Sequence, residues 1–386
     1  MSAGSAAAEG GAGRLYSVAP YGNLTGAPIC ALNHACRMRA GFASVCLVLP
    51  QDGEIRVRAE AAGVPVLLWP IENRGLRARL FRRGVLADLR AVLVSRGRYY
   101  ASFCRELRRA PGVVHVHSRA SIAPLALLAA RRCGVPAVLH VHETARPGWK
   151  NSWGARLLCA LASAVVFVSD GIRQGYPAAL RRRAQVIHNF LEWPPAPPPR
   201  EPAVPVVASI AWQSLAKGYD MFLEACRLLR DRGNVFEAWL IGQWNEEADR
   251  QRAERFIRDN HLEATVRIRG LLADMADVYA RVDILLLPTR RDSFPRVVME
   301  AMGHGVPVVA TRIDGVPEMV AEGQTGFMVE SGDAAGFAAA TEKLLRDPAL
   351  RRDLGAAGRA RARTLFSPET YVERMQALYR QIGGLP

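Results

Sequence analysis

The chain has 386 residues, of which 50% are hydrophobic and 23% are charged, a composition typical of globular proteins. This length is too great for one ordinary hydrophobic core and predicts two domains. No apolar run reaches the roughly 18 residues that a membrane-spanning helix needs. The seven cysteines include no Cys-x-x-Cys pair, which favours reduced thiols in a cytosolic protein over a disulfide scaffold. Residues 1–13, rich in Ala, Gly and Ser, predict a disordered tail and not a signal peptide.

The formal net charge of +15 comes from the N-terminal half of the chain. Residues 1–200 carry 27 Lys and Arg against 10 Asp and Glu, whereas residues 201–386 carry 24 against 26. Within the first half, residues 74–109 hold eleven arginines and two acidic residues. This basic segment suits an anionic membrane surface or acceptor, or a solvated helix face. Nucleic acid is a weaker interpretation, because no recognisable nucleic-acid module accompanies the charge.

The first part of the chain alternates between short apolar runs and helical segments. Strands are predicted over Leu15–Ala19, Ser44–Leu49 and Val66–Trp69. A helix is predicted over 29–38, and the turn at 21–28 precedes it. The amides of this turn, with Thr25 and Gly26, would face a ligand at the end of the first strand. The basic segment 74–109 is expected to be helical.

Two further strands are predicted over Val113–His117 and Val138–His142, and each ends in a His-x-His pattern. Strand alternation places His115 with His117, and His140 with His142, on common faces. Such imidazoles either pack and hydrogen-bond at the strand ends or bind a metal ion such as zinc. No cysteine or carboxylate pattern completes a metal site. The packed arrangement is therefore favoured, and no metal is expected.

A proline-rich run at 193–203 is the plainest linker in the sequence, and its polyproline character predicts a semi-rigid spacer. It would separate an N-terminal domain, 14–192, from a C-terminal domain, 204–367. The remaining residues, 368–386, are expected to form a final helix. The first domain closes with strands predicted over Ala164–Ser169 and Gln185–His188.

The second domain is predicted to repeat the α/β pattern, because short apolar runs bounded by turns are typical of buried parallel strands. Its strands are expected over Val204–Ile210, Ala238–Gly242, Val266–Gly270, Ile284–Leu287, Val306–Thr311 and Gly326–Val329. Its helices are expected over Met221–Arg230, Met275–Ala280, Arg296–Gly303, Val316–Glu322 and 334–363.

The most informative stretch, residues 288–320, follows the strand Ile284–Leu287. Pro295 fixes the backbone angle that suits a helix start. Asp292 lies in the turn before it, and Glu300 lies about two helical turns further on. Carboxylates at these places can accept hydrogen bonds from a sugar and from a ribose diol. The amides at the helix N-terminus form an anion-binding site. They belong to Ser293, Phe294, Arg296 and Val297.

This stretch resembles the acidic-x7-acidic signature of retaining glycosyltransferases with the GT-B fold, in family 4, the group 1 glycosyltransferases. In that family the first carboxylate binds the transferred sugar and the second binds the ribose, which implies these roles for Asp292 and Glu300. The Gly-Val-Pro-Glu sequence at 315–318 also matches. The family usually has Glu first, whereas Asp292 is shorter by one methylene. The resemblance implies an α/β architecture of two Rossmann-like domains that face each other across a cleft.

The resemblance also assigns roles in the second domain. Lys217 matches the lysine that clamps the donor diphosphate, but the arginine that usually assists it falls on Trp212. A lysine alone cannot supply the bidentate fork of a guanidinium. We expect an arginine of the facing turn to replace it. The candidates are Arg290, Arg291 and Arg296. Gly242 would allow close approach of the nucleotide, and the base would stack against Gly270 and Leu271.

In the first domain, His142 resembles the family's histidine beside the transferred sugar, and Gly26 falls in the loop where the family has Gly-Gly-Ala-Pro. The resemblance also implies that the last helix crosses back onto the first domain. Lys217, Asp292 and His142 are thus the expected catalytic residues.

The predicted activity is a retaining transfer of a hexose-type sugar from a nucleotide-sugar donor to a glycan or lipid-linked acceptor. Bacterial cell-envelope polysaccharide or lipopolysaccharide biosynthesis is the expected setting. No Asp-x-Asp stands at a strand end, so neither a metal nor another cofactor is expected. The expected location is cytoplasmic, with peripheral attachment to the inner face of the plasma membrane.

Two alternatives stay open. A GT-B-fold nucleotide-sugar epimerase would need further carboxylates in the first domain, where only Glu143 is seen. A catalytically weakened homologue with a structural role would explain Trp212 and Asp292 together.

Overall fold

A computed structural model describes residues 12–71, 85–118, 122–144, 153–182, 184–195, 202–272 and 274–385. The chain divides into two compact units. The first unit contains residues 1–168, 173–187 and 369–386, and the second contains 169–172 and 188–368. The predicted linker at 193–203 lies partly outside the described residues, and the domain limits given above stay predictions.

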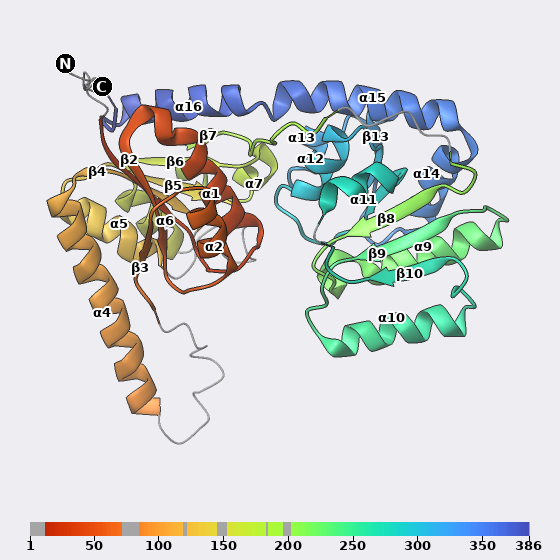
Figure 1. Cartoon of the computed structure of the whole chain (residues 1–386), viewed down its shortest axis with the longest axis horizontal. Coiled ribbons are helices and arrows are strands. Elements are labelled where there is room, and N and C mark those ends of the chain that lie inside the picture. Colours follow the sequence, from red (N-terminus) through yellow and green to blue (C-terminus); the bar gives the residue numbers. More distant parts are fainter. Residues whose placement is uncertain are drawn as a thin grey trace, which may run out of the picture. The chain divides into compact units, whose positions relative to one another are not determined.

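The first unit is built on a seven-stranded parallel sheet with the strand order β3-β2-β1-β4-β5-β6-β7 (Figure 1). The strands are β1 (Ala12–Val18), β2 (Phe42–Leu49), β3 (Val66–Leu68), β4 (Gly112–His117), β5 (Ala137–Val141), β6 (Ala164–Phe167) and β7 (Ala184–Val186). The order reverses between β1 and β4, which is where ligands bind in open α/β sheets, beyond the carboxyl ends of the strands.

The helices of the first unit pack against this sheet. They are α1 (Gly26–Arg37), α2 (Glu54–Ala61), α4 (Val85–Arg109), α5 (Ala123–Arg132), α6 (Trp153–Leu161) and α8 (Ala178–Arg181). The long helix α4 lies beside α5, and α5 lies beside α6 (Figure 1). Helix α16 (Pro368–Gln381) joins this unit from Glu369 onward. The short helix α7 (Asp170–Gln174) begins in the second unit and ends in the first.

The second unit has a six-stranded parallel sheet with the order β10-β9-β8-β11-β12-β13. The strands are β8 (Val206–Ile210), β9 (Glu237–Ile241), β10 (Val266–Arg269), β11 (Ile284–Leu287), β12 (Val308–Thr311) and β13 (Gly326–Val329). The helices are α9 (Tyr219–Asp231), α10 (Glu247–Asp259), α11 (Met275–Arg281), α12 (Arg296–Gly303), α13 (Val316–Met319), α14 (Ala334–Arg346) and α15 (Pro348–Leu365). The order reverses between β8 and β11, so the loops that follow these two strands are neighbours.

Three elements were predicted with the correct bounds from the local sequence. The bounds predicted for β11, α12 and β13 match the structure. All four residues of β11 are buried, as expected for a strand covered on both faces.

Three predictions need correction. The first strand already begins at Ala12, so residues 12 and 13 are not tail. Helix α13 ends at Met319 and not at Glu322. The long helix predicted over 334–363 is two helices, because Asp347 caps a new helix by accepting a hydrogen bond from the Leu350 amide, and Pro348 suits its first position. Helices α2, α5 and α10 were not predicted.

Within these described ranges, no helix is both long enough and apolar enough to cross a membrane.

Candidate functional site

Two loops of the second unit meet beyond the neighbouring strands β8 and β11. After β8, a short 3-10 helix, η3 (Leu215–Lys217), leads to Gly218, whose φ of 77° is in the left-handed region. A Cβ atom at Gly218 would lie 1.9 Å from the carbonyl oxygen of Pro288. Only glycine therefore allows the loop after β8 to pass so close to the loop after β11.

Hydrogen bonds fix this contact between the loops. The Thr289 hydroxyl and the Arg290 amide both donate to the Ala216 carbonyl, at 3.1 and 2.9 Å. The Arg290 guanidinium forms two 2.7 Å hydrogen bonds with the Asp220 carboxylate. A bidentate pair of this kind holds both partners in one geometry. The loops are thus held together on either side of Lys217.

Lys217 and Asp292, both predicted site residues, are brought into direct contact. The distance from Lys217 Nζ to Asp292 Oδ2 is 2.5 Å. The two side chains are 27% and 18% exposed, so the pair is partly shielded but open to a ligand. Lysine has three donor hydrogens and the carboxylate has a second oxygen. Each group therefore keeps capacity to bind another molecule while it is paired.

Glu300 lies in α12 and is held by two neighbours. Its carboxylate accepts a hydrogen bond from the Tyr279 hydroxyl at 3.1 Å and from Arg296 at 3.2 Å. Burial, followed by the nearby Glu300 charge, raises the pKa of Tyr279 well above its usual value. Tyr279 therefore stays a neutral donor. It also stacks on His304 at 4.9 Å between ring centroids. Glu300 has its carboxylate orientation set before any ligand arrives.

The turn before α12 is anchored by its aromatic residue. The Phe294 side chain is 5% exposed and stacks on His188, with ring centroids 5.0 Å apart. The Ser293 carbonyl accepts a hydrogen bond from the Gly315 amide at 3.2 Å. Helix α12 begins at Arg296, so the amides of Arg296 and Val297 belong to its first turn. The Phe294 side chain is thus part of the interior, and any role in ligand binding falls to the backbone.

The three arginines near this turn differ in their partners. Arg290 pairs with Asp220 and Arg296 with Glu300. Arg291 is exposed, and its guanidinium has no ion-pair partner in the described part of the chain. Of the three candidates for the missing arginine, Arg291 is therefore best placed to bind an anion. Trp212, where the arginine is usual, is 42% exposed.

The predicted nucleotide-binding glycines of the second unit have different surroundings. Gly242 has a φ of 126°, and a Cβ atom there would lie 1.8 Å from the Ala211 carbonyl oxygen. Packing of the backbone already requires this glycine. Gly270 has open space around a hypothetical Cβ atom within the described structure, and Leu271 is 67% exposed. Gly270 and Leu271 are therefore accessible from outside the described structure.

Glu318, from the Gly-Val-Pro-Glu sequence, has a role that the sequence did not reveal. Its two carboxylate oxygens accept hydrogen bonds from the amides of Asp170 and Gly171, at 2.9 and 2.8 Å. These amides open α7, where a negative charge is favourable. The spacing of the motif does not identify residues almost 150 positions away as partners.

In the first unit, Gly26 is the first residue of α1 and is exposed, with open space around it in the described coordinates. The Thr25 hydroxyl does not cap this helix but donates to the Asn23 side chain at 3.0 Å. The amides at the start of α1 are thus placed at the carboxyl end of β1, as expected for a ligand-facing turn.

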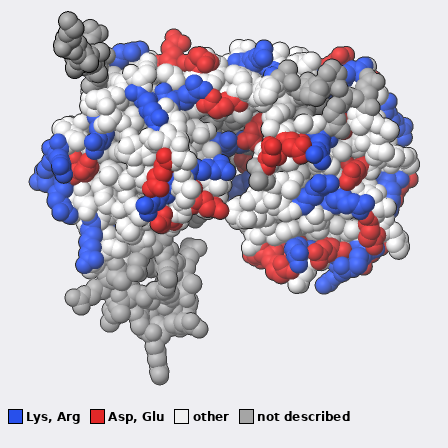
Figure 2. All heavy atoms as spheres, in the orientation of Figure 1, with Lys and Arg blue, Asp and Glu red and all other residues white. Residues whose placement is uncertain are grey.

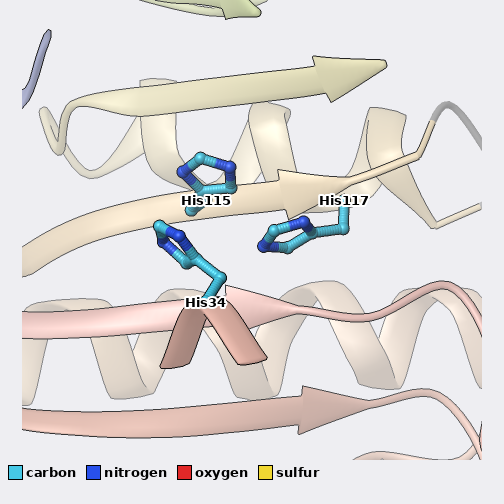
Figure 3. Close-up of side chains that lie close together, drawn as sticks. All are labelled: His34, His115 and His117. Atoms are coloured by element: carbon cyan, nitrogen blue, oxygen red, sulfur yellow. The ribbon is translucent and has the colours of Figure 1, made fainter. Parts of the chain in front are cut away.

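His142 belongs to a buried group of five histidines, the histidine cluster, defined as His34, His115, His117, His140 and His142. His34 comes from α1 and was not predicted to join the others. Figure 3 shows its ring turned toward those of His115 and His117, which both project from β4. His142 is 9% exposed and the other four are at most 1% exposed.

A chain of hydrogen bonds runs through the cluster. His140 Nδ1 lies 3.2 Å from His115 Nε2, and His115 Nδ1 lies 2.6 Å from the Tyr379 hydroxyl. That hydroxyl lies 2.7 Å from His34 Nε2, and His34 Nδ1 lies 2.9 Å from the Tyr371 hydroxyl. Both tyrosines come from α16, so the cluster ties the end of the chain to the first unit.

Burial keeps the cluster uncharged. It lowers the pKa of His34 and of His142 to about 3. Burial, with repulsion from neighbouring histidines, puts the pKa values of the other three well below their usual range. Neutral imidazoles can accept a proton or a hydrogen bond, or bind a metal. The predicted packed arrangement is present, with more hydrogen bonds and one more member than the sequence indicated.

Two parallel-sheet α/β domains with these loops at the strand ends define the GT-B class of glycosyltransferases. Two family models match: "Glycosyl transferase 4-like domain" over residues 25–190 and "Glycosyl transferases group 1" over residues 201–347. Together they account for most of both units. The chain belongs to the group 1 glycosyltransferases.

Two bacterial proteins are among those similar to this chain. N-acetyl-alpha-D-glucosaminyl L-malate synthase of Bacillus anthracis is 33% identical over 33% of this chain and 34% of its own length. The lipopolysaccharide core biosynthesis glycosyltransferase LpsE of Rhizobium meliloti is 31% identical over 44% of this chain and 48% of its own. The matched part of the chain thus spans less than half the length of these curated relatives.

Solved structures show the same fold over nearly the whole chain. Anabaena Alr3699/HepE in complex with UDP-glucose has a TM-score of 0.78 and 20% identity, and the match covers 96% of this chain and 100% of that one. Both units therefore follow the GT-B fold.

The histidine cluster predicts a loss of stability on mild acidification. Above the unfolded-state pKa of about 6.5, folded and unfolded cluster histidines are all neutral, so they add no pH dependence. Below this pKa, the histidines of the unfolded chain bind protons, whereas those of the folded cluster stay neutral. Each histidine should then lower the free energy of unfolding by up to about 1.4 kcal/mol per pH unit, down to the folded pKa.

Thermal unfolding followed at pH values from 7.5 down to 5 checks this. We expect the melting temperature to be level near neutrality and to fall steeply below pH 6.5. The variant His261→Gln, outside the cluster, should give the same profile. A melting temperature that stays level to pH 5 would contradict a neutral buried cluster.

Proposed function

We propose that this protein transfers a hexose-type sugar from a nucleotide-sugar donor to a glycan or lipid-linked acceptor of a bacterial cell envelope. The observation that carries the proposal is the contact of Lys217 with Asp292 at the sheet reversal of the second unit. Family membership supports a glycosyl transfer. The relative named for lipopolysaccharide core biosynthesis and the neighbour solved with UDP-glucose support the acceptor and donor classes.

The donor diphosphate would be bound by positive groups of the second unit. Lys217 has donor hydrogens beyond the one directed at Asp292. Arg291 would supply the guanidinium that Trp212 cannot. The backbone of Ser293 and Phe294, with the first amides of α12, adds the positive end of a helix. These groups together would stabilise the charge that develops on the departing nucleoside diphosphate.

The sugar and the ribose would be bound by the two carboxylates. Asp292 has one oxygen on Lys217, and its other oxygen can accept a sugar hydroxyl. Glu300, already oriented by Tyr279 and Arg296, would accept hydrogen bonds from the ribose diol. The base would lie against Gly270 and the exposed Leu271. His142 is the residue of the first unit that we propose to contact the transferred sugar.

Transfer would proceed with retention of anomeric configuration and without a metal on the diphosphate. The chain has no Asp-x-Asp sequence at a strand end, and we assign the neutralising charge to Lys217 and Arg291. The acceptor hydroxyl would approach the face from which the phosphate departs, and the departing phosphate oxygen would take its proton. This route needs no strong protein base.

Replacing Lys217 tests the proposed role of the cation. We expect Lys217→Ala to lower kcat/KM by about 100-fold or more, because a donor aimed at developing charge in the transition state is lost. Lys343→Ala is the matched control, since Lys343 is exposed and lies over the Phe327 ring on another part of the second unit.

The assay is release of nucleoside diphosphate from a donor first identified by thermal shift among UDP-, GDP-, ADP- and dTDP-sugars. Unchanged turnover in Lys217→Ala would refute the assignment. Release that does not depend on added acceptor, with a free sugar as product, would instead favour the epimerase. No release with any donor would favour a homologue without activity.

We further propose that the first unit binds an anionic membrane surface through α4 and α5. Exposed arginines lie on both helices, and Figure 2 shows Lys and Arg gathered on this side of the first unit. They are Arg98, Arg105, Arg108, Arg109, Arg131 and Arg132. Three apolar residues on the same helices, Leu93, Val94 and Leu128, are between 41% and 62% exposed. Basic and apolar side chains together suit the interface of an anionic bilayer.

Sedimentation with vesicles checks this surface. We expect binding to phosphatidylcholine vesicles that contain phosphatidylglycerol, little binding to phosphatidylcholine alone, and release by salt. The double variant Arg108→Glu/Arg109→Glu should lose most binding. Arg255→Glu/Arg258→Glu, with the same charge change on α10, should keep it. Equal binding of both variants, or none by the wild type, would exclude the proposed surface.

A further inference from the structure

The carbonyl of Ser293, in the turn before α12, is held by two donors. The Gly315 amide donates a hydrogen bond to it at 3.2 Å, and the Ser169 hydroxyl donates another at 3.4 Å. The Ser169 oxygen also accepts the Ile172 amide at 3.2 Å, which helps to fix the direction of the hydroxyl. A Cβ atom at Gly315 would lie 2.7 Å from the Ser293 carbonyl oxygen and 2.9 Å from Ser169 Cβ. The carbonyl therefore cannot turn without losing both hydrogen bonds.

The same two hydrogen bonds set the direction of the Phe294 amide. The peptide bond between Ser293 and Phe294 is trans, so its C=O and N–H point in opposite directions. The amide therefore points away from the two donors that hold the carbonyl. No backbone carbonyl accepts this amide in the described part of the chain. The Phe294 amide is thus a fixed donor in the turn that carries Asp292.

The segment that contributes Ser169 is itself anchored by Glu318. The two carboxylate oxygens of Glu318 accept the amides of residues 170 and 171, at 2.9 and 2.8 Å. A Cβ atom at Gly171 would lie 1.9 Å from the Asp314 carbonyl oxygen, so the segment packs directly on the loop before α13. Residues 169–172 all belong to the second unit. Glu318 therefore holds in place the segment from which Ser169 reaches the turn.

A second contact links Glu318 to the same turn. His188 Nε2 lies 3.8 Å from Glu318 Oε2, and the His188 ring stacks on Phe294 with 8° between the ring planes. The turn is also held at the preceding residue, where Asp292 pairs with Lys217. The backbone between Asp292 and Phe294 is thus fixed by neighbours at each of its residues.

We propose that Ser169 and Glu318 are positioning residues that direct the Phe294 amide at the donor diphosphate. This inference rests on the proposed function, because the ligand of the amide is the diphosphate of that donor. An amide aimed in advance needs no reorganisation while negative charge develops on the departing group. Without Glu318 the segment 169–172 loses its anchor, and the peptide after Ser293 can rotate. A rotated peptide would present a carbonyl oxygen to the phosphate, and the two oxygens would repel each other.

Selective ¹⁵N labelling of phenylalanine tests the direction of the amide. The chain has 12 phenylalanines, and the signal of Phe294 is identified by its loss in Phe294→Leu. We expect the amide proton of Phe294 to shift downfield when the donor-derived nucleoside diphosphate saturates the wild type. Glu318→Ala, also saturated with nucleotide, should lose at least half of this shift. The control Glu330→Ala, whose side chain is 75% exposed in the same unit, should keep it.

Turnover separates a positioning role from a merely structural one. We expect Glu318→Ala to lower kcat about tenfold with little change in the KM for the donor, because the lost interaction is made with developing charge. Glu318→Gln keeps one oxygen that can accept an amide, so it should recover part of the rate. Ser169→Ala, which removes one of the two bonds to the carbonyl, should show a smaller loss. All variants are assayed below their measured melting temperatures.

Thermal shift establishes independently whether the nucleotide binds. A nucleoside diphosphate that binds the wild type without shifting the Phe294 amide would overturn the inference and leave the proposed function intact. A full shift or an unchanged kcat in Glu318→Ala would also overturn the inference. If Glu318→Ala does not fold, Ser169→Ala decides by the same two measurements. If no nucleotide binds the wild type, the proposed function fails and the inference fails with it.

Discussion

The contact between Lys217 and Asp292 sets the arrangement of the second unit at its strand ends. It joins a loop that follows β8 to a loop that follows β11, and these strands are neighbours because the order of the sheet reverses between them. The approach is close enough only because Gly218 has no side chain to meet the Pro288 carbonyl. Lys217 Nζ and Asp292 Oδ2, of opposite charge and 2.5 Å apart, then hold the two loops together. Partial burial of the pair strengthens the attraction between the two charges.

Charged side chains around this contact are also fixed by neighbouring residues. Two charged groups beside it are each held by a second residue: Arg290 by Asp220, and Glu300 by Tyr279. Groups fixed in advance need less reorganisation when a charged ligand arrives, which is how electrostatic catalysis gains most of its effect. The overall charge of the second half of the chain is close to balanced, so any attraction for a diphosphate comes from local placement.

Much of this arrangement was predictable. The apolar run of β11, the proline before α12 and the spacing of Asp292 and Glu300 identify a strand, a turn and a helix from local sequence alone. The direct pairing of Lys217 with Asp292 was not predictable, because it depends on how two distant loops approach each other. For the same reason the sequence did not bring His34 into the cluster, nor Tyr371 and Tyr379 from a helix more than 300 residues later.

Helices α2, α5 and α10 were not predicted for another reason, because they lie outside the loops that resemble the family. Gly242 shows the converse limit. This glycine was predicted to allow close approach of a nucleotide, but the contact with the Ala211 carbonyl already requires a glycine at this position.

The central claim is that a nucleoside diphosphate binds at the Lys217–Asp292 contact. A crystal structure of the chain with its donor-derived nucleoside diphosphate tests it most directly. The account predicts a phosphate oxygen within hydrogen-bonding distance of Lys217 Nζ and the ribose diol on Glu300. A diphosphate bound away from Lys217, with the ribose on other residues, would contradict it.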